Sequence, residues 1–163
     1  ERIVELYESD SLIASMNHPE RDCIYNEAFV VMYIRYEQER VVVDWCRKLR
    51  KEKYPRHNGL YETNVMFRKH NTSLIVETNV MWWDCIEKFS KRDQLSFNYV
   101  LWKVGLKCDY FLDRSLNARN SEDFSIVTHK NEGKKVYSYD NKEWLLKYAY
   151  KKPYKKVIVM QRY

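Results

Sequence analysis

Polar residues of the types that chemistry uses gather at four places where the chain is expected to change direction. A carboxylate can take the proton of a hydroxyl group, an arginine offers a planar fork of donors to a phosphate, and a tryptophan ring can stack on a flat ligand. Several such groups within a short segment could bind the same ligand. The four places are His18–Arg21, Gly59–Asn64, Trp82–Asp84 and Ser90–Phe97.

Each of these places also has an ordinary structural explanation. A lone histidine before proline, as at His18, is more often a turn residue than a catalyst. Glu62 can face solvent from a strand, and Trp82 can belong to the core. Asp93 at a helix start is explained by capping and by the positive end of the helix dipole. The four places predict a function only when they are taken together.

The elements that would position these groups follow from apolar periodicity and turn residues. The pattern contains too few strands for a complete sheet, so the chain is expected to form one side of a larger α/β domain. The expected segments are, in chain order, helix 1–9, turn 15–23, helices within 23–53, strand 61–68, a helix that starts at 73 or 78 and ends at 89, helix 90–104, extended segment 108–112 and helix 141–148.

The same patterns predict details of the helices. The β-branched run 41–43 predicts a break between two helices within 23–53. Ser90 is expected to cap the helix that Gly105 ends. Helix 1–9 is expected to turn inward the side chains of Ile3, Val4 and Tyr7. Helix 73–89 repeats large side chains at steps of three, at Val80, Trp83, Ile86 and Phe89.

The charge is unevenly distributed along the chain. Residues 130–163 hold ten Lys/Arg and three Asp/Glu, a charge of +7, whereas the rest holds 19 basic and 20 acidic residues. We therefore expect a body, residues 1–129, and a basic extension, residues 130–163. Such an extension fits nucleic acid or an anionic membrane surface. No run of 18 apolar residues occurs, so no segment is expected to span a bilayer.

The four cysteines do not have the spacing of a zinc site. Cys23, Cys46, Cys85 and Cys108 lie 23, 39 and 23 residues apart, whereas zinc ligands usually come in pairs about two to four residues apart. A free cysteine in apolar surroundings packs as a small hydrophobe. We therefore expect free structural thiols and a reducing, cytoplasmic location.

Three stretches of the chain together resemble one known family. They are HPERDCIYNEA (18–28), NGLYETNVMFRKH (58–70) and WWDCIEKFSKRDQLSFNYVLWK (82–103). They resemble a glycosyltransferase-like family found in bacterial polysaccharide gene clusters and in plant proteins connected with mucilage and cell-wall polysaccharides. The motifs GLYETN and SKRDQLSF are the specific part, and the resemblance covers about residues 10–110.

The resemblance implies a GT-A-like fold, which is a nucleotide-binding α/β fold. This chain would be its helix-rich, acceptor-side part with an incomplete sheet. The implied activity transfers a sugar, in a galactosyltransferase-like manner, from a nucleotide-sugar donor to a growing cell-surface polysaccharide or a lipid-linked acceptor. Together with the cysteines and the basic extension, this leads us to expect a cytoplasmic protein at the inner face of the plasma membrane.

The resemblance also implies a divalent metal, Mn²⁺ or Mg²⁺, since hard cations suit carboxylate and phosphate oxygens. In the family pattern, the donor-binding strands and an Asp-x-Asp-like motif precede the HPERDC segment. No such motif precedes His18 here, so this chain alone is expected to be inactive. His129 would be the late histidine that completes the metal shell.

Roles for the candidate residues follow from the needs of glycosyl transfer, which uses a base to activate the acceptor hydroxyl. Asp93 would be that base, with Glu62 as the second catalytic carboxylate. The candidate substrate-binding residues are His18, Arg21, Thr63, Asn64, Arg68, Trp82, Trp83, Arg92 and Gln94. Among them, His18 and Arg21 would lie near the diphosphate, and a tryptophan would stack on the acceptor sugar.

Other classes of function stay open. A nucleic-acid-binding module would use the basic extension, but the chain has no RNP-like, zinc-finger or KH-type motif, so no nucleic acid is expected as a partner. A non-catalytic domain could bind a protein partner through exposed aromatic residues. A cysteine hydrolase that pairs Cys23 with His18 would need an oxyanion motif, and the sequence shows none.

Overall fold

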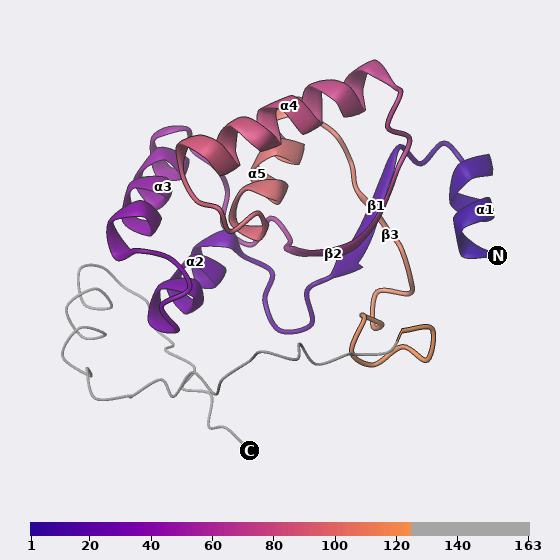
Figure 1. Cartoon of the computed structure of the whole chain (residues 1–163), viewed down its shortest axis with the longest axis horizontal. Coiled ribbons are helices and arrows are strands. Elements are labelled where there is room, and N and C mark those ends of the chain that lie inside the picture. The colour runs from indigo at the N-terminus through magenta and orange to yellow at the C-terminus, as the bar shows by residue number, and fades with distance from the viewer. Residues whose placement is uncertain (125–163) are drawn as a thin grey trace. The chain divides into compact units, whose positions relative to one another are not determined.

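The computed structural model describes residues 1–124, all of which belong to the unit Glu1–Thr128. These residues form a mixed α/β structure, which confirms the expected class (Figure 1). The basic extension, the expected helix 141–148 and His129 lie outside the described residues. The elements are α1 (Arg2–Glu8), β1 (Ile13–Asn17), α2 (Ile24–Tyr33), α3 (Glu39–Lys51), β2 (Tyr61–Arg68), α4 (Ser73–Lys88), α5 (Gln94–Val104) and β3 (Asp109–Tyr110).

The described strands form one sheet in the order β2-β1-β3. The central strand β1 pairs antiparallel with β2 and parallel with β3. The register between β1 and β2 shifts after Ser15, which pairs with Met66, because the next residue, Met16, pairs with Glu62. Residues 63–65 of β2 are thereby left without a partner in β1. They form a bulge, a feature that often lies next to functional sites.

Each face of this sheet is covered by a different part of the chain. Side chains of α4 and α5, such as Ile75 and Phe97, pack with Ile13 on one face. On the other face, Ala14 and Met16 pack against Leu6 of α1 and against the segment that follows β3. Figure 1 shows α4 and α5 on one side of the sheet and that segment on the other.

A separate core joins α2, α3 and α5 around Trp45. Residues Val42, Trp45 and Leu49 lie at helical spacing on α3 and are buried. The indole Nε1 of Trp45 donates a hydrogen bond to the carbonyl of Leu95 at 2.9 Å, which attaches α3 to the start of α5. Gly105 then ends α5 in the left-handed conformation with φ 68°, as expected.

The expectation of a turn at residues 15–17 was wrong, because these residues belong to the buried central strand β1. The polar Ser15 interrupts the run of apolar residues that would have indicated a buried strand in the sequence. Its hydroxyl donates to the carbonyls of Glu62 and Val65, at 2.6 and 3.1 Å, and so fills the bulge. A serine that satisfies backbone groups in this way is compatible with full burial.

Several details of the helices also differ from expectation. The chain breaks at residues 34–38, where Arg35 has φ 58°, and the β-branched run 41–43 lies inside α3. Ser90 precedes Asp93, which is the residue at the cap position of α5. The side chains expected to face inward from α1 are exposed, namely Ile3, Val4 and Tyr7, and so are Val80 and Trp83 of α4. Leu6 and Cys85 are buried on these helices instead.

Candidate functional site

Several of the candidate residues lie near the carboxyl end of β1, where the chain leaves the sheet. His18 follows the last residue of β1, and its backbone N–H donates to the carbonyl of Leu60 just before β2, at 2.9 Å. Ligands of open α/β sheets usually bind at the carboxyl ends of strands. The position of His18, beside the start of β2, therefore favours this end of the sheet as the site.

His18 is buried and held by the turn that follows it. Its Nδ1 accepts hydrogen bonds from the backbone N–H groups of Glu20 and Arg21, each at 3.1 Å. A neutral ring therefore carries its proton on Nε2. That nitrogen lies 3.8 Å from Oε2 of Glu27 and 3.1 Å from Nη2 of Arg21.

Arg21 connects this histidine to a buried carboxylate of α2. Its Nε donates to Oε2 of Glu27 at 2.6 Å, and its Nη1 donates to Glu20 at 2.8 Å. Glu27 is buried, so the guanidinium neutralises a charge that would be costly to bury alone. The donors of Arg21 are thus used within the protein, and this does not favour the expected diphosphate contact.

The pKa of His18 is lowered from 6.5 to about 4, chiefly because burial disfavours its charged form. The neighbouring Arg21 and Arg119 lower the pKa further, whereas Glu20 raises it. At neutral pH the ring is therefore neutral. In that state Nε2 carries the ring proton and faces another donor, Nη2 of Arg21, so these two atoms do not hydrogen-bond to each other.

This shift predicts a loss of stability in mild acid. The unfolded chain binds a proton at His18 near pH 6.5 and the folded chain only near pH 4. The stabilisation is therefore complete above pH 6.5 and is lost as the pH falls towards 4, by on the order of 1–3 kcal/mol. We expect His18→Asn, which stays neutral and keeps an acceptor, to flatten this part of the pH dependence of unfolding.

Chemical denaturation at a series of pH values between 4 and 7 measures this effect. His70→Asn is the matched control, because His70 is exposed and should leave the wild-type slope unchanged. An identical slope for His18→Asn and wild type would show that the His18 ring does not contribute to the acid loss.

Glu62 is the second buried carboxylate of this region. It pairs in register with Met16, and its Oε1 forms an ion pair with Nη1 of Arg119. Its other oxygen, Oε2, is buried and has no hydrogen-bond partner. Buried polar atoms without partners are rare and costly, and they often belong to functional groups.

Glu62 and Thr63 lie on opposite faces of the sheet, because successive residues of a strand alternate. The hydroxyl of Thr63 donates to Oδ2 of Asp93 at 2.7 Å, on the face covered by α5. Glu62 instead contacts Arg119, on the face covered by the segment after β3. The two candidate catalytic carboxylates are therefore held on different sides of β2.

Asp93 lies at the N-terminus of α5 and is tied to several candidate residues. Its carboxylate makes no cap hydrogen bond within the helix. Its carbonyl accepts from Nε1 of Trp82 at 3.2 Å, and the next side chain, Gln94, donates to the carbonyl of Tyr61 at 3.3 Å. Trp82, Thr63, Asp93 and Gln94 are thus brought together around the start of β2.

Arg92 lies at the edge of the same group. Its guanidinium lies over the ring of Tyr36, 5.0 Å from the centroid, and its Nε is buried without a hydrogen-bond partner. Ser90 fixes the backbone here, since its hydroxyl accepts from the N–H of Arg92 at 3.0 Å and donates to Glu37 at 2.9 Å.

Other candidate residues lie away from these groups. Arg68 is exposed at the far end of β2 and donates to Asn79 at 2.9 Å. It is five residues from Thr63, or about 16 Å along a strand. Trp83 is 60% exposed on α4, and Asn64 is exposed in the bulge. His129 lies outside the described residues.

Two residues of the site had been given no role, namely Arg119 and Glu27, although Glu27 follows the first of the four places. Arg119 lies in a polar, irregular segment far along the chain from Glu62. No local sequence pattern therefore indicates that the two residues are in contact. Glu27 does have a local signal, because it falls in HPERDCIYNEA, six residues after Arg21. A charged residue at an inward position of a helix can be recognised as a partner for a nearby opposite charge.

The cysteines behave as structural thiols within the described chain. All four are free. Burial raises the pKa of Cys46 and of Cys85 to about 11 and that of Cys108 to about 12, so these thiols are poor nucleophiles. Cys23 is buried, and Nδ1 of His18 is already occupied by backbone N–H groups. This geometry does not favour a Cys23–His18 hydrolase.

The described residues do not fit a divalent metal. Among residues 1–124, no group of three or more His, Cys, Asp or Glu side chains is arranged to hold an ion. The ring of His18 is unsuited as a metal ligand, because Nδ1 accepts backbone hydrogen bonds and Nε2 faces a guanidinium.

None of the helices within residues 1–124 has the length and apolar character needed to span a bilayer.

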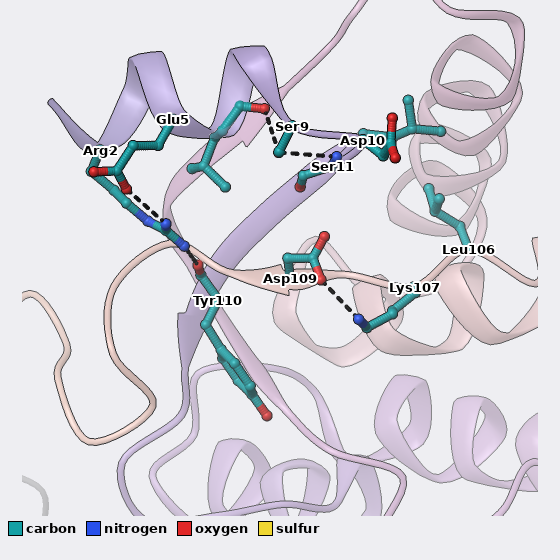
Figure 2. Close-up of a pocket in the computed structure, with 11 residues that line it drawn as sticks. Arg2, Glu5, Ser9, Asp10, Ser11, Leu106, Lys107, Asp109 and Tyr110 are labelled. Atoms are coloured by element: carbon teal, nitrogen blue, oxygen red, sulfur yellow. Dashed lines mark hydrogen bonds and ion pairs between the residues drawn. The ribbon is translucent and has the colours of Figure 1, made fainter.

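An open pocket of about 780 Å³ lies at the other end of the sheet, between α1 and the starts of β1 and β3 (Figure 2). Four of its charged groups form ion pairs: Arg2 lies 3.1 Å from Glu5, and Lys107 lies 3.1 Å from Asp109; Asp10 also lines the pocket. None of the candidate residues lines this pocket. The carboxyl end of β1 therefore remains the candidate site.

Comparison with known proteins gives one match. The family model described as "TOD1/MUCI70, glycosyltransferase-like domain" matches residues 3–129, which is well over half of the chain. This range contains every candidate residue, and Glu27 and Arg119 as well. The resemblance to a glycosyltransferase-like family is thereby confirmed. No curated protein and no solved structure matches the chain.

Proposed function

We propose that this chain, which belongs to the TOD1/MUCI70, glycosyltransferase-like domain family, is the acceptor-side part of a GT-A-like glycosyltransferase. The proposed reaction moves a sugar, with galactose as the first candidate, from a nucleotide-sugar donor to a glycan or lipid-linked acceptor. That acceptor would be a growing cell-surface polysaccharide, of the kind made by the bacterial polysaccharide gene clusters in which the resembling family is found. The family match supports the class of transferase, and the donor, the acceptor and the GT-A architecture are our proposal.

The observation that carries the proposal is the Oε2 atom of Glu62. It is a buried carboxylate oxygen without a hydrogen-bond partner, close to the carboxyl end of the central strand. A sugar hydroxyl would be a suitable donor for such an oxygen. The neutral ring of His18 and the cation of Arg119 complete this environment.

In the proposed reaction, a carboxylate takes the proton of the acceptor hydroxyl while the hydroxyl oxygen bonds to the anomeric carbon. The bond from that carbon to the diphosphate breaks, and the diphosphate leaves with the electron pair. Asp93 and Glu62 are the candidates for the base. Asp93 has the favourable position at a helix N-terminus, and Thr63 orients its carboxylate.

A divalent metal, Mn²⁺ or Mg²⁺, remains part of the proposal for the whole enzyme. It would neutralise the charge of the leaving diphosphate. Its ligands would have to come from beyond residues 1–124, with His129 as the candidate in this chain. The steps proposed for Asp93 and Glu62 do not depend on it.

The basic extension suggests a location at the inner face of the plasma membrane, where lipid-linked acceptors are assembled. Residues 147–156 contain five lysines with interleaved tyrosines, and each lysine near an anionic surface is worth about 1 kcal/mol. We expect the protein to sediment with anionic vesicles at low salt and to be released at high salt. Recovery with neutral vesicles in equal amount would refute this location.

A transfer assay tests the proposed function directly. The full-length protein is incubated with labelled UDP- and GDP-sugars, Mn²⁺ and oligosaccharide acceptors, and labelled product is separated from the donor. We expect label to enter the acceptor with release of the nucleoside diphosphate. Absence of product with every donor, together with nucleic acid that co-purifies at low salt, would favour the alternative of a non-catalytic binding module that uses the basic extension.

A further inference from the structure

The segment after β3 is held together mainly by its own hydrogen bonds. Asp113 accepts from the N–H and hydroxyl of Ser115, at 2.9 and 2.6 Å. The N–H of Asn117 donates to the side chain of Asn120 at 2.7 Å, and the side chain of Asn120 donates back to the carbonyl of Ser115 at 3.1 Å. Residues 113–121 are therefore a locally closed unit.

Few polar contacts connect this unit to the rest of the described chain. The last backbone hydrogen bond to the sheet joins the N–H of Phe111 to the carbonyl of Ser15, at 2.9 Å. Beyond it, Arg119 to Glu62 is the one ion pair between residues 113–121 and the other described residues. Apolar contact with the sheet face comes from Phe111, Leu112, Ala118 and Phe124.

The two partners of this ion pair are buried to very different extents. The side chain of Glu62 is only 5% exposed, whereas that of Arg119 is 59% exposed. The Oε2 atom of Glu62 is covered and still has no partner. A ligand can reach this oxygen only when something above it moves, and a largely exposed arginine on a locally closed segment is the group that can move with least disruption.

We propose that Arg119 is a positioning residue for Glu62, and that residues 113–121 form a lid that this ion pair holds closed. In the closed state the guanidinium neutralises and orients the buried carboxylate. When the lid opens, the carboxylate becomes accessible to a hydroxyl of the sugar substrate. The part that concerns the sugar rests on the proposed function, but the lid itself does not.

Hydrogen exchange of the full chain without any substrate tests this inference. In Arg119→Gln the guanidinium is lost while the side chain of Glu62 is unaltered. We expect backbone amides of residues 113–121 to exchange about fivefold faster or more, with β1 and α5 unchanged. Arg119→Lys should restore part of the protection, because it keeps the cation. Glu62→Gln should act like Arg119→Gln, and the double variant should add little to either single change.

Arg114→Gln is the matched control. It removes the same charge from the same segment, and Arg114 is exposed, with its guanidinium over the ring of Tyr110, 5.7 Å from the centroid, rather than against Glu62. Its exchange should rise clearly less than that of Arg119→Gln. Unchanged exchange of residues 113–121 in Arg119→Gln would overturn the inference. So would an equal rise in β1 and α5, because the pair would then be an ordinary structural contact of the whole unit. A lid without transferase activity would refute the proposed function and leave the lid intact.

Discussion

Glu62→Gln is expected to lower the rate of sugar transfer by the full-length protein at least about a hundredfold. A carboxylate that acts on the acceptor hydroxyl contributes typically about 10²–10⁴-fold to a rate. Glutamine keeps the size of the side chain and removes its charge and basicity. The initial rate of labelled-sugar transfer at saturating donor measures the effect.

The fold should survive this change, because a neutral side chain is easier to bury than a charge. Circular dichroism and the melting temperature check this independently of activity. Glu122→Gln is the control, since Glu122 is exposed on the segment that also carries Arg119. A wild-type transfer rate in Glu62→Gln would show that the free oxygen of Glu62 has no part in the chemistry.

Asp93→Asn is expected to show a loss of similar size, at least about a hundredfold, with near-normal melting. A capping carboxylate would contribute roughly 0.5–2 kcal/mol to stability. The Asp93 carboxylate makes no cap hydrogen bond, and its contact is with the hydroxyl of Thr63. Asparagine can still accept that hydrogen bond through its amide oxygen. Transfer rate and melting temperature together measure the prediction.

Ser90→Ala should show the opposite pattern. Ser90 is buried and joins Glu37 to the backbone of Arg92. Its loss should lower the melting temperature and leave most of the transfer rate. If Asp93→Asn melts early and still transfers sugar at the wild-type rate, Asp93 is a structural residue and its proposed role as a base is wrong.

The sequence predicted those elements whose signals are local. The alternation in residues 61–68 predicted β2, and Gly105 predicted the end of α5. The central strand β1 was missed because its polar Ser15 is satisfied by carbonyls that lie 47 and 50 residues away. The prediction of which side chains of α1 face inward was wrong for a related reason. Which side of a short helix is buried depends on the sheet beneath it.

The candidate site divides in the same way. Motif resemblance brought together Thr63 and Asp93, which are 30 residues apart and in contact. Resemblance could not reveal that Glu62 faces the opposite side of β2. That arrangement depends on the pleat of the strand and on the bulge. The partner of Glu62, Arg119, lies 57 residues away in an irregular segment, where neither periodicity nor turn residues indicate a contact.

The bulge in β2 also affects how readily the exposed edge of the sheet could pair with another chain. Among the described residues, β2 is an outer strand of the sheet, and its unpaired backbone groups could template the addition of another chain. The regular ladder with β1 is limited to Met66–Arg68 on one side of the bulge and to Tyr61 and Glu62 on the other. Such short stretches, twisted against each other, offer an incoming strand little continuous surface to pair with. The bulge that follows Glu62 thus also makes this edge a poorer template for aggregation.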